Sequence, residues 1–344
     1  MPFRDVIGHR RLVSLLSRSA ERGSVPPSLI FAGPSGVGKR LVALATAQAL
    51  NCLAPRRTPP SSPAVLDAVG YDACGTCAAC TRIARRIHPD VMILEPDDKG
   101  AIKIDVVRDV VDRVGYRPFE GRRRVVIIDE ADAMGAPPQN ALLKTLEEPP
   151  SSSMLILISA RPDALLATVR SRCPRLTFRP LSADDVTAAL VRQGKTQSQA
   201  HAIAATADGS IGRALEANAD DFVEAREVAA RVLVNAAATD DPRRRVEAGQ
   251  AMVPKKSQGG AADREHLAMH LRAMASLIRD AELLAADADR GALANPDVVS
   301  ELDRLSAFQG DRGLRAFEAL DRALTALERN ASVKIVADWV SLQL

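Results

Sequence analysis

Aromatic side chains are scarce in this chain of 344 residues: one Trp, two Tyr and seven Phe amount to 3% of it. Proteins that bind single-stranded nucleic acid often stack the bases on exposed rings, so this composition argues against a stacking surface as the main binding device. A large excess of one charge is also lacking, because 46 Lys and Arg stand against 43 Asp and Glu. The formal net charge of +3 therefore predicts no particular partner. Basic stretches at 117–125 and 242–245 are typical of solvated faces, with phosphate contact as the alternative.

Long apolar runs are missing as well. No run of eighteen or more apolar residues occurs, so we expect no membrane span. Residues 1–11 carry several charges and no apolar core of the kind found in secretory leaders. We therefore expect the protein in the cytoplasm, where its five cysteines are not expected to form structural disulfides.

The first 180 residues alternate between short apolar runs and segments with helical spacing. We expect strands at 28–33, 91–96, 123–132 and 153–160, and helices at 40–53, 104–116 and 137–150. This alternation predicts a doubly wound parallel sheet of the α/β class. After residue 181 the pattern is helical to the end, beginning with a start signal at Ser182. Because the chain is too long for one ordinary core, we predict three domains, 1–180, 181–235 and 236–344.

A glycine-rich loop joins the first expected strand to the first expected helix. Its sequence GPSGVGK contains Gly33, Ser35, Gly36, Gly38 and Lys39. Such a loop lets backbone N–H groups surround phosphate, and its lysine reaches the β- and γ-phosphates. A plain glycine turn is the alternative.

The third expected strand ends in acidic residues, which favours the phosphate-binding interpretation. In VVIIDEAD, Asp129 is placed to hold magnesium and Glu130 to polarise an attacking water molecule. A charged turn at the end of a strand is the alternative for this motif. The two motifs together, in this order, predict a P-loop fold that binds ATP or ADP.

Arg40 departs from the phosphate-loop pattern. The usual Ser or Thr hydroxyl at this position ligates magnesium, whereas a guanidinium has five donors, no lone pair and a permanent charge. We therefore expect nucleotide binding without efficient hydrolysis, and the use of magnesium stays open.

Four of the five cysteines have a spacing typical of a metal site. Cys52 ends the helix after the glycine loop, and Cys74, Cys77 and Cys80 follow in CGTCAAC. Four thiolates suit a structural zinc ion in a module at about 52–80, with an iron–sulfur cluster or ordinary buried thiols as alternatives. His88 indicates a structural turn, and Cys173 indicates plain packing.

Taken together, these motifs resemble one family, the bacterial clamp-loader subunits of DNA polymerase III within the AAA+ class. The matching stretches are FRDVIGH (3–9), LIFAGPSGVGK (29–39), the four cysteines, HPD (88–90), VVIIDEAD (125–132), QNALLKTLEEPP (139–150), LILIS (155–159), SRC (171–173) and GSIGRAL (209–215). They cover about the first 215 residues. Arg40 and the length make the chain most similar to the delta prime branch of the family, and the last 110 residues match only by position and helical texture.

The resemblance implies roles that the residues alone do not. It makes Arg172 an arginine finger that reaches into a neighbouring subunit's ATP site and stabilises charge on the γ-phosphate. It places Ser159 as a polar sensor at the end of a strand and Arg213 as a second sensor from the helical lid. It sets Lys144, with Gln139 and Asn140, on a helix beside primer–template DNA, where contact would be to the backbone only. An ordinary exposed helix face is the alternative for Lys144.

The resemblance also implies partners. We expect a hetero-oligomer with gamma/tau and delta subunits, joined by a helical collar at 236–344, which loads a sliding clamp onto primed DNA. A catalytically active gamma-like ATPase is the second hypothesis, and a free-standing zinc protein that binds nucleic acid is the third. Under the leading hypothesis the chain is a component of the polymerase holoenzyme and is not itself a nucleotidyltransferase.

Overall fold

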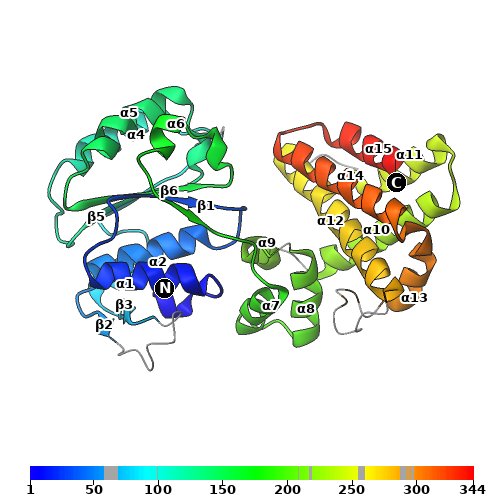
Figure 1. The fold of residues 1–344 in the computed structure, drawn as a ribbon, viewed down its shortest axis with the longest axis horizontal. Helices are drawn as coiled ribbons and strands as arrows, with labels where there is room; N and C mark the ends of the chain where they lie inside the picture. Colours follow the sequence, from blue (N-terminus) through cyan, green and yellow to red (C-terminus); the bar gives the residue numbers. More distant parts are fainter. Residues whose placement is uncertain are drawn as a thin grey trace. The chain divides into compact units, whose positions relative to one another are not determined.

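The computed structural model describes residues 1–57, 69–98, 100–207, 209–216, 219–254, 260–286, 293, 295 and 298–344. The chain divides into two compact units, each described here by itself (Figure 1). The first unit is Met1–Asp185 with Ser210–Gly212, and the second is Val186–Gly209 with Arg213–Leu344. The boundary expected near residue 235, between two helical domains, stays a prediction.

A five-stranded parallel sheet with the order β4-β5-β6-β1-β7 forms the centre of the first unit. Its strands are β1 (Ser28–Ala32), β4 (Val91–Leu94), β5 (Arg124–Ile128), β6 (Ser153–Ser159) and β7 (Arg175–Thr177). Strands β1, β5 and β6 are buried along their whole length, as unbroken apolar runs predict for a sheet covered on both faces. The predicted parallel α/β sheet is confirmed.

Helices cover both faces of this sheet (Figure 1). One face carries α1 (Arg10–Glu21) and α2 (Lys39–Asn51), and the other carries α4 (Ile104–Val114), α5 (Ala136–Glu147) and α6 (Ala167–Arg170). Successive residues of a strand point to opposite faces, so Ile127 packs in the core with α1 and α2 while Ile128 packs in the core with α4 and α5. These two cores fix the sheet between its helices.

The cysteine-rich segment is inserted between α2 and β4. It contains β2 (Arg56–Arg57), paired antiparallel with β3 (Tyr71–Asp72), and α3 (Ala78–Ala84). The short helix η1 (Phe3–Asp5) fastens this segment to the unit, because the Asp72 carboxylate accepts from the Phe3 and Arg4 amides at 2.8 and 3.1 Å. The Arg4 guanidinium donates to the carbonyls of Ala73 and Cys74 at 2.8 and 2.9 Å. The first residues therefore hold the insertion in place.

The HPD motif forms a turn before β4. His88 is buried, and its Nδ1 accepts from the Asp90 amide at 3.1 Å. The fully buried Asp90 carboxylate accepts from three successive amides, those of Phe119, Glu120 and Gly121, at 2.7 to 2.9 Å. It also pairs with Arg124 at 3.0 Å. The motif therefore fixes the loop that leads into β5.

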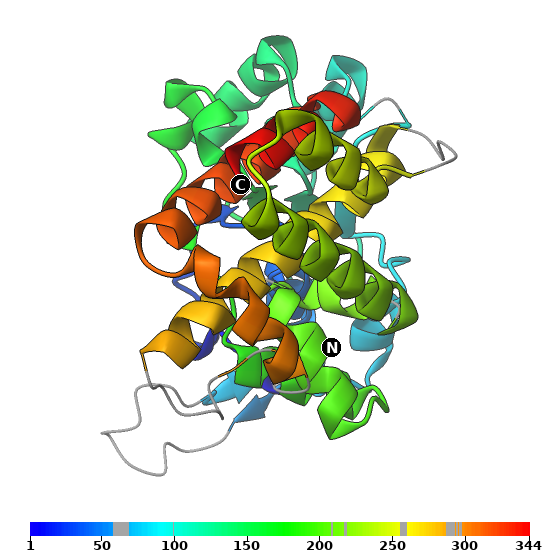
Figure 2. The same ribbon diagram turned by 90° about the vertical axis from the view of Figure 1, so that its right-hand side faces the viewer.

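The second unit is helical. Its main elements, some of which begin in the first unit, are α7 (Ala183–Arg192), α8 (Gln197–Thr206), α9 (Ile211–Glu216), α10 (Ala219–Ala238), α11 (Pro242–Gly249), α12 (Gly260–Ala285), α13 (Val299–Leu302), α14 (Asp311–Glu328) and α15 (Val333–Gln343). Helix α12 packs against α10 and α14, and α15 packs against α11 and α14 (Figure 2). Leu271, Leu277 and Phe308 are fully buried in its core. Among the residues that the structure describes, none of the helices combines the length and the hydropathy that a membrane span requires.

Candidate functional site

The glycine loop lies between β1 and α2, as predicted. Gly33 has a φ of 152°, and a Cβ there would come within 2.1 Å of the Phe178 carbonyl oxygen. Gly38 has a φ of 96°, which side chains other than hydrogen rarely allow. The Gly212 amide donates to the Gly36 carbonyl at 2.9 Å, so Ser210–Gly212 braces the loop. Ser35 is exposed between these fixed points.

Lys39 is the first residue of α2 and lies against the loop. Its buried Nζ donates to the carbonyls of Gly33 and Pro34, both at 2.6 Å. Burial lowers the pKa of Lys39, while the carboxylates of Asp129 and Asp132 favour its charged form. The ammonium group is therefore held at the loop beside the acidic residues that follow β5.

Three acidic residues follow β5 at the same edge of the sheet. Asp129 comes directly after the strand, and Glu130 has a φ of 48° and a ψ of 48°, a left-handed conformation uncommon outside glycine. Burial, followed by the carboxylates of Asp129 and Asp132, raises the pKa of Glu130. Such strain and charge crowding are typical of functional sites.

Ser159 ends β6 at this edge and belongs to a small polar network. Its buried Oγ donates to Asp132 Oδ1 at 2.8 Å, and the same carboxylate pairs with Arg161 Nε at 3.0 Å. The sequence alone did not predict that Asp132 joins this network. Its position three residues after Asp129 was the only available signal.

Arg40 points to the acidic residues rather than away from them. Its Nη1 forms ion pairs with Asp129, at 3.1 Å, and with Glu95. Glu95 follows β4, and sequence reasoning missed it. It could have been found by the rule that locates Asp129, because the carboxyl ends of adjacent parallel strands lie at one edge of the sheet.

These residues do not fit a magnesium ion. The hydroxyl that would ligate it is replaced by a guanidinium, which has no lone pair. The same guanidinium already neutralises Asp129, the carboxylate expected to hold the metal. A divalent cation would meet the positive charges of both Lys39 and Arg40 at this place.

Arg172 lies at the other edge of the sheet. It follows α6, and its carbonyl accepts from the Oγ of Ser28, the first residue of β1, at 3.2 Å. The Arg172 side chain is about one-third exposed, and its guanidinium donates to the Thr168 carbonyl at 2.8 Å and forms an ion pair with Glu147. Glu147, in the LEEPP stretch, is a partner that the sequence alone did not reveal. Arg213 begins a part of the second unit, and its sensor role stays a prediction.

Helix α5 has two different sides. Gln139 is buried, donates to the Met134 carbonyl at 2.8 Å and accepts from the Leu166 amide at 2.7 Å. It therefore joins the start of α5 to the segment that leads to Arg172. Asn140 and Lys144 are exposed.

The four predicted metal ligands lie together. The sulfurs of Cys52, Cys74, Cys77 and Cys80 are all within 4.8 Å of one another. Zinc–sulfur bonds of about 2.3 Å place tetrahedral sulfurs about 3.8 Å apart, and Cys74 and Cys80 are separated by 4.0 Å. Burial raises the pKa of the Cys74 thiol, but the amides of Cys77 and Thr76 that donate to it bring the pKa to about 6. The donor set fits a closed tetrahedral metal site, whereas Cys173 is buried separately.

The fold and this site define a class of protein. A glycine loop between an inner parallel strand and a helix, facing carboxylates that follow two other strands, is the arrangement of a P-loop α/β protein. The sequence profile described as DNA polymerase III, delta subunit, matches residues 8–182, which is just over half of the chain. The chain belongs to this family.

Individual relatives agree with this assignment. The delta prime subunit of DNA polymerase III from Pseudomonas aeruginosa is 39% identical over 161 residues, 46% of this chain and 45% of that protein. The delta prime subunit from Bacillus subtilis is 31% identical over 217 residues, 63% of this chain and 61% of that protein. A gamma/tau subunit from Mycobacterium tuberculosis is 32% identical over 190 residues, 55% of this chain and 31% of that protein. The matches thus span about half the length of the delta prime relatives, and the predicted resemblance to DNA polymerase III clamp-loader subunits is confirmed.

Proposed function

We propose that this chain is a delta prime-like AAA+ subunit of the cytoplasmic DNA polymerase III clamp loader. It assembles with gamma/tau and delta subunits and helps to load the sliding clamp onto primed DNA. The observation that carries the proposal is the separation of two features: Arg40 pairs with Asp129 beside the glycine loop, while Arg172 lies at the opposite edge of the sheet. The chain can therefore assist a partner's hydrolysis while its own site is impaired.

Arg172 supplies this assistance as an arginine finger. In the isolated chain its guanidinium is paired with Glu147 and remains partly exposed, so it can exchange that partner for the γ-phosphate of a neighbouring subunit. There it stabilises the charge that develops during phosphoryl transfer. Glu147 keeps the side chain ordered until the neighbour is in place.

Reconstitution with gamma or tau and delta tests this role. Arg172→Ala is expected to leave folding and assembly intact and to lower clamp-stimulated ATP hydrolysis by about tenfold or more at the site it serves. Arg175→Ala, an exposed arginine on β7, is the matched control. Unchanged hydrolysis by the assembled Arg172→Ala complex would show that the trans role is wrong.

A gamma-like ATPase is the second candidate function, and the similarity to gamma/tau subunits supports it. Residue 40 separates the two. Under the leading proposal the native chain alone turns over little ATP, and Arg40→Thr raises turnover by restoring a magnesium ligand. Native turnover equal to or above that of the variant would favour the ATPase.

The cysteine module has a structural part in this proposal. Zinc held by Cys52, Cys74, Cys77 and Cys80 would close the insertion and fix it to α2, where the Gln48 side chain donates to the Cys80 carbonyl at 2.8 Å. The exposed Lys144 suits backbone contact with primer–template DNA within the complex.

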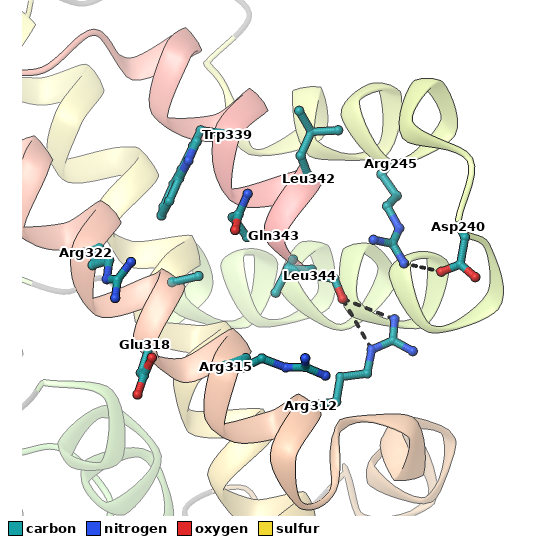
Figure 3. Close-up of a pocket in the computed structure, with 11 residues that line it drawn as sticks. Asp240, Arg245, Arg312, Arg315, Glu318, Arg322, Trp339, Leu342, Gln343 and Leu344 are labelled. Atoms are coloured by element: carbon teal, nitrogen blue, oxygen red, sulfur yellow. Dashed lines mark hydrogen bonds and ion pairs between the residues drawn. The ribbon is translucent and has the colours of Figure 1, made fainter.

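The second unit supplies a surface suited to a collar. Residues of α14 and α15, with Asp240 and Arg245, line a cavity of about 600 Å³ (Figure 3). Arg245 forms an ion pair with Asp240, and Arg312 donates a hydrogen bond to the Leu344 carbonyl. Arg315 and Arg322, in contrast, have no ion-pair partner in the described part of the chain, and Trp339 is 36% exposed beside them. Exposed Trp and Arg are the residue types that most often anchor protein interfaces.

A further inference from the structure

We propose that Arg40 takes the place of the magnesium ion, so that the glycine loop binds the phosphate groups of a nucleotide without a divalent cation. The inference rests on the proposed nucleotide site and goes beyond it by giving that site its own built-in cation. It starts from the misfit between the residues present and a magnesium ion.

The guanidinium of Arg40 divides into two sides. Nη1 faces two carboxylates, with Asp129 Oδ2 at 3.1 Å and Glu95 as the second partner. A metal ion at this place would likewise be held by the Asp129 carboxylate. Arg40 therefore makes on its inner side a contact that the implied metal would make.

The other side of the guanidinium lacks partners. Nε and Nη2 are both buried, and neither donates a hydrogen bond in the described part of the chain. Buried charged donors are normally paired. The Nε–Nη2 edge presents two parallel N–H groups, which match the spacing of two oxygens of one phosphate group. A phosphate bound at the loop would satisfy both donors.

The charges at this edge of the sheet lead to the same conclusion. Asp129, Glu130 and Glu95 bring negative charge close to the place that phosphate would take. With Lys39 as its only cation, the site would carry a net negative charge, which a magnesium ion offsets in sites of this type. Because Arg40 is permanently charged, it removes the need for that correction.

The occupant is therefore a nucleoside di- or triphosphate, bound by Lys39, Arg40 and the glycine-loop amides. Its binding is insensitive to chelators. Because Asp129 stays paired with Arg40, the bound nucleotide has no metal ion to promote its hydrolysis. The nucleotide would thus remain bound as a structural part of the unit and would not be hydrolysed.

Titration calorimetry on the full chain with ADP, ATP and pyrophosphate tests this inference. Native affinity should agree within about threefold in magnesium and in EDTA. Arg40→Thr should bind about tenfold or more weakly in EDTA and recover in magnesium. Pyrophosphate distinguishes phosphate recognition from recognition of the whole nucleotide. Arg108→Gln is the matched control, because Arg108 is an exposed arginine of α4 that pairs with Asp105, and its replacement should change nothing.

Native binding that requires magnesium, or no binding of any of the three ligands in either buffer, would overturn the inference. The second result would mean that Arg40 only closes the site. Assembly with gamma or tau and delta, followed by gel filtration of the same samples, keeps the proposed function separate. If the chain assembles and its Arg172 supports ATP hydrolysis by the complex, but it binds none of the ligands, the proposed function stands and only this inference is overturned.

Discussion

Asp90 is the residue on which a whole loop depends. Burial raises the pKa of its carboxyl, but the Glu120, Gly121 and Phe119 amides and Arg124 outweigh this and lower it from 3.8 to about 2. A lowered pKa means that the carboxylate stabilises the fold at pH values above 3.8. That stabilisation is lost as the pH falls towards 2.

Asp90→Asn should therefore destabilise the first unit by about 2 kcal/mol or more at neutral pH, because an amide replaces the charge that three N–H groups and Arg124 require. Urea unfolding from pH 7 to pH 2 is the measurement, and the difference between native and variant should shrink below pH 4. Asp105→Asn, at an exposed carboxylate, is the control. A difference that stays constant down to pH 2 would contradict the assignment.

Gln139 is a second residue whose side chain acts on the backbone. Gln139→Leu keeps the volume but leaves the Leu166 amide and the Met134 carbonyl without their partner. We expect a loss of about 2 kcal/mol in the free energy of unfolding, since buried polar groups would be left unpaired. The neighbouring Asn140→Leu, on the exposed side of α5, should change stability by less than about 0.5 kcal/mol. Equal effects of the two substitutions would show that burial at residue 139 is not the cause.

At the scale of elements, the zinc site proposed for the cysteine module can be tested by removing one of its ligands. Cys80→Ser should abolish the stoichiometric zinc of about one ion per chain and lower the thermal midpoint of the first unit. Elemental analysis and calorimetry give the two readouts. Cys173→Ser changes a buried thiol outside the module and should retain the metal. Native protein purified without chelator that contains no zinc would reject the site.

The elements also show what sequence could predict. Unbroken apolar runs predicted β1, β5 and β6, and the order of glycine loop and acidic strand predicted the P-loop arrangement that places Lys39 and Asp129 at the same edge of the sheet. Both are periodicity and topology arguments, which depend on local pattern. Ion-pair partners such as Glu95 for Arg40 and Glu147 for Arg172 join separate elements. The sequence alone does not distinguish the carboxylate that will pair with a given arginine, because the fold decides which one lies near the guanidinium.

At the scale of the whole molecule, the two units differ in how they are built. The first unit holds every described residue of the candidate nucleotide and cysteine sites except Arg213, whereas the second is a helical assembly around Leu271, Leu277 and Phe308. Because their cores are separate, damage to one core need not unfold the other. The sites of the first unit and the surface of the second can therefore be altered independently.

The last prediction uses this independence. Trp339→Ala with Arg322→Glu alters the cavity of Figure 3 without touching the first unit, and should abolish co-elution with gamma or tau and delta. Zinc content and nucleotide affinity of the isolated variant should equal those of the native chain. Arg304→Glu reverses an exposed charge elsewhere on the second unit and is the matched control. Normal assembly of the double variant would show that the collar forms through another face. Both substituted side chains are partly or fully exposed, so the double variant should keep the native helix content. Circular dichroism of the isolated chain measures this content and shows whether lost assembly is due to the altered surface or to unfolding.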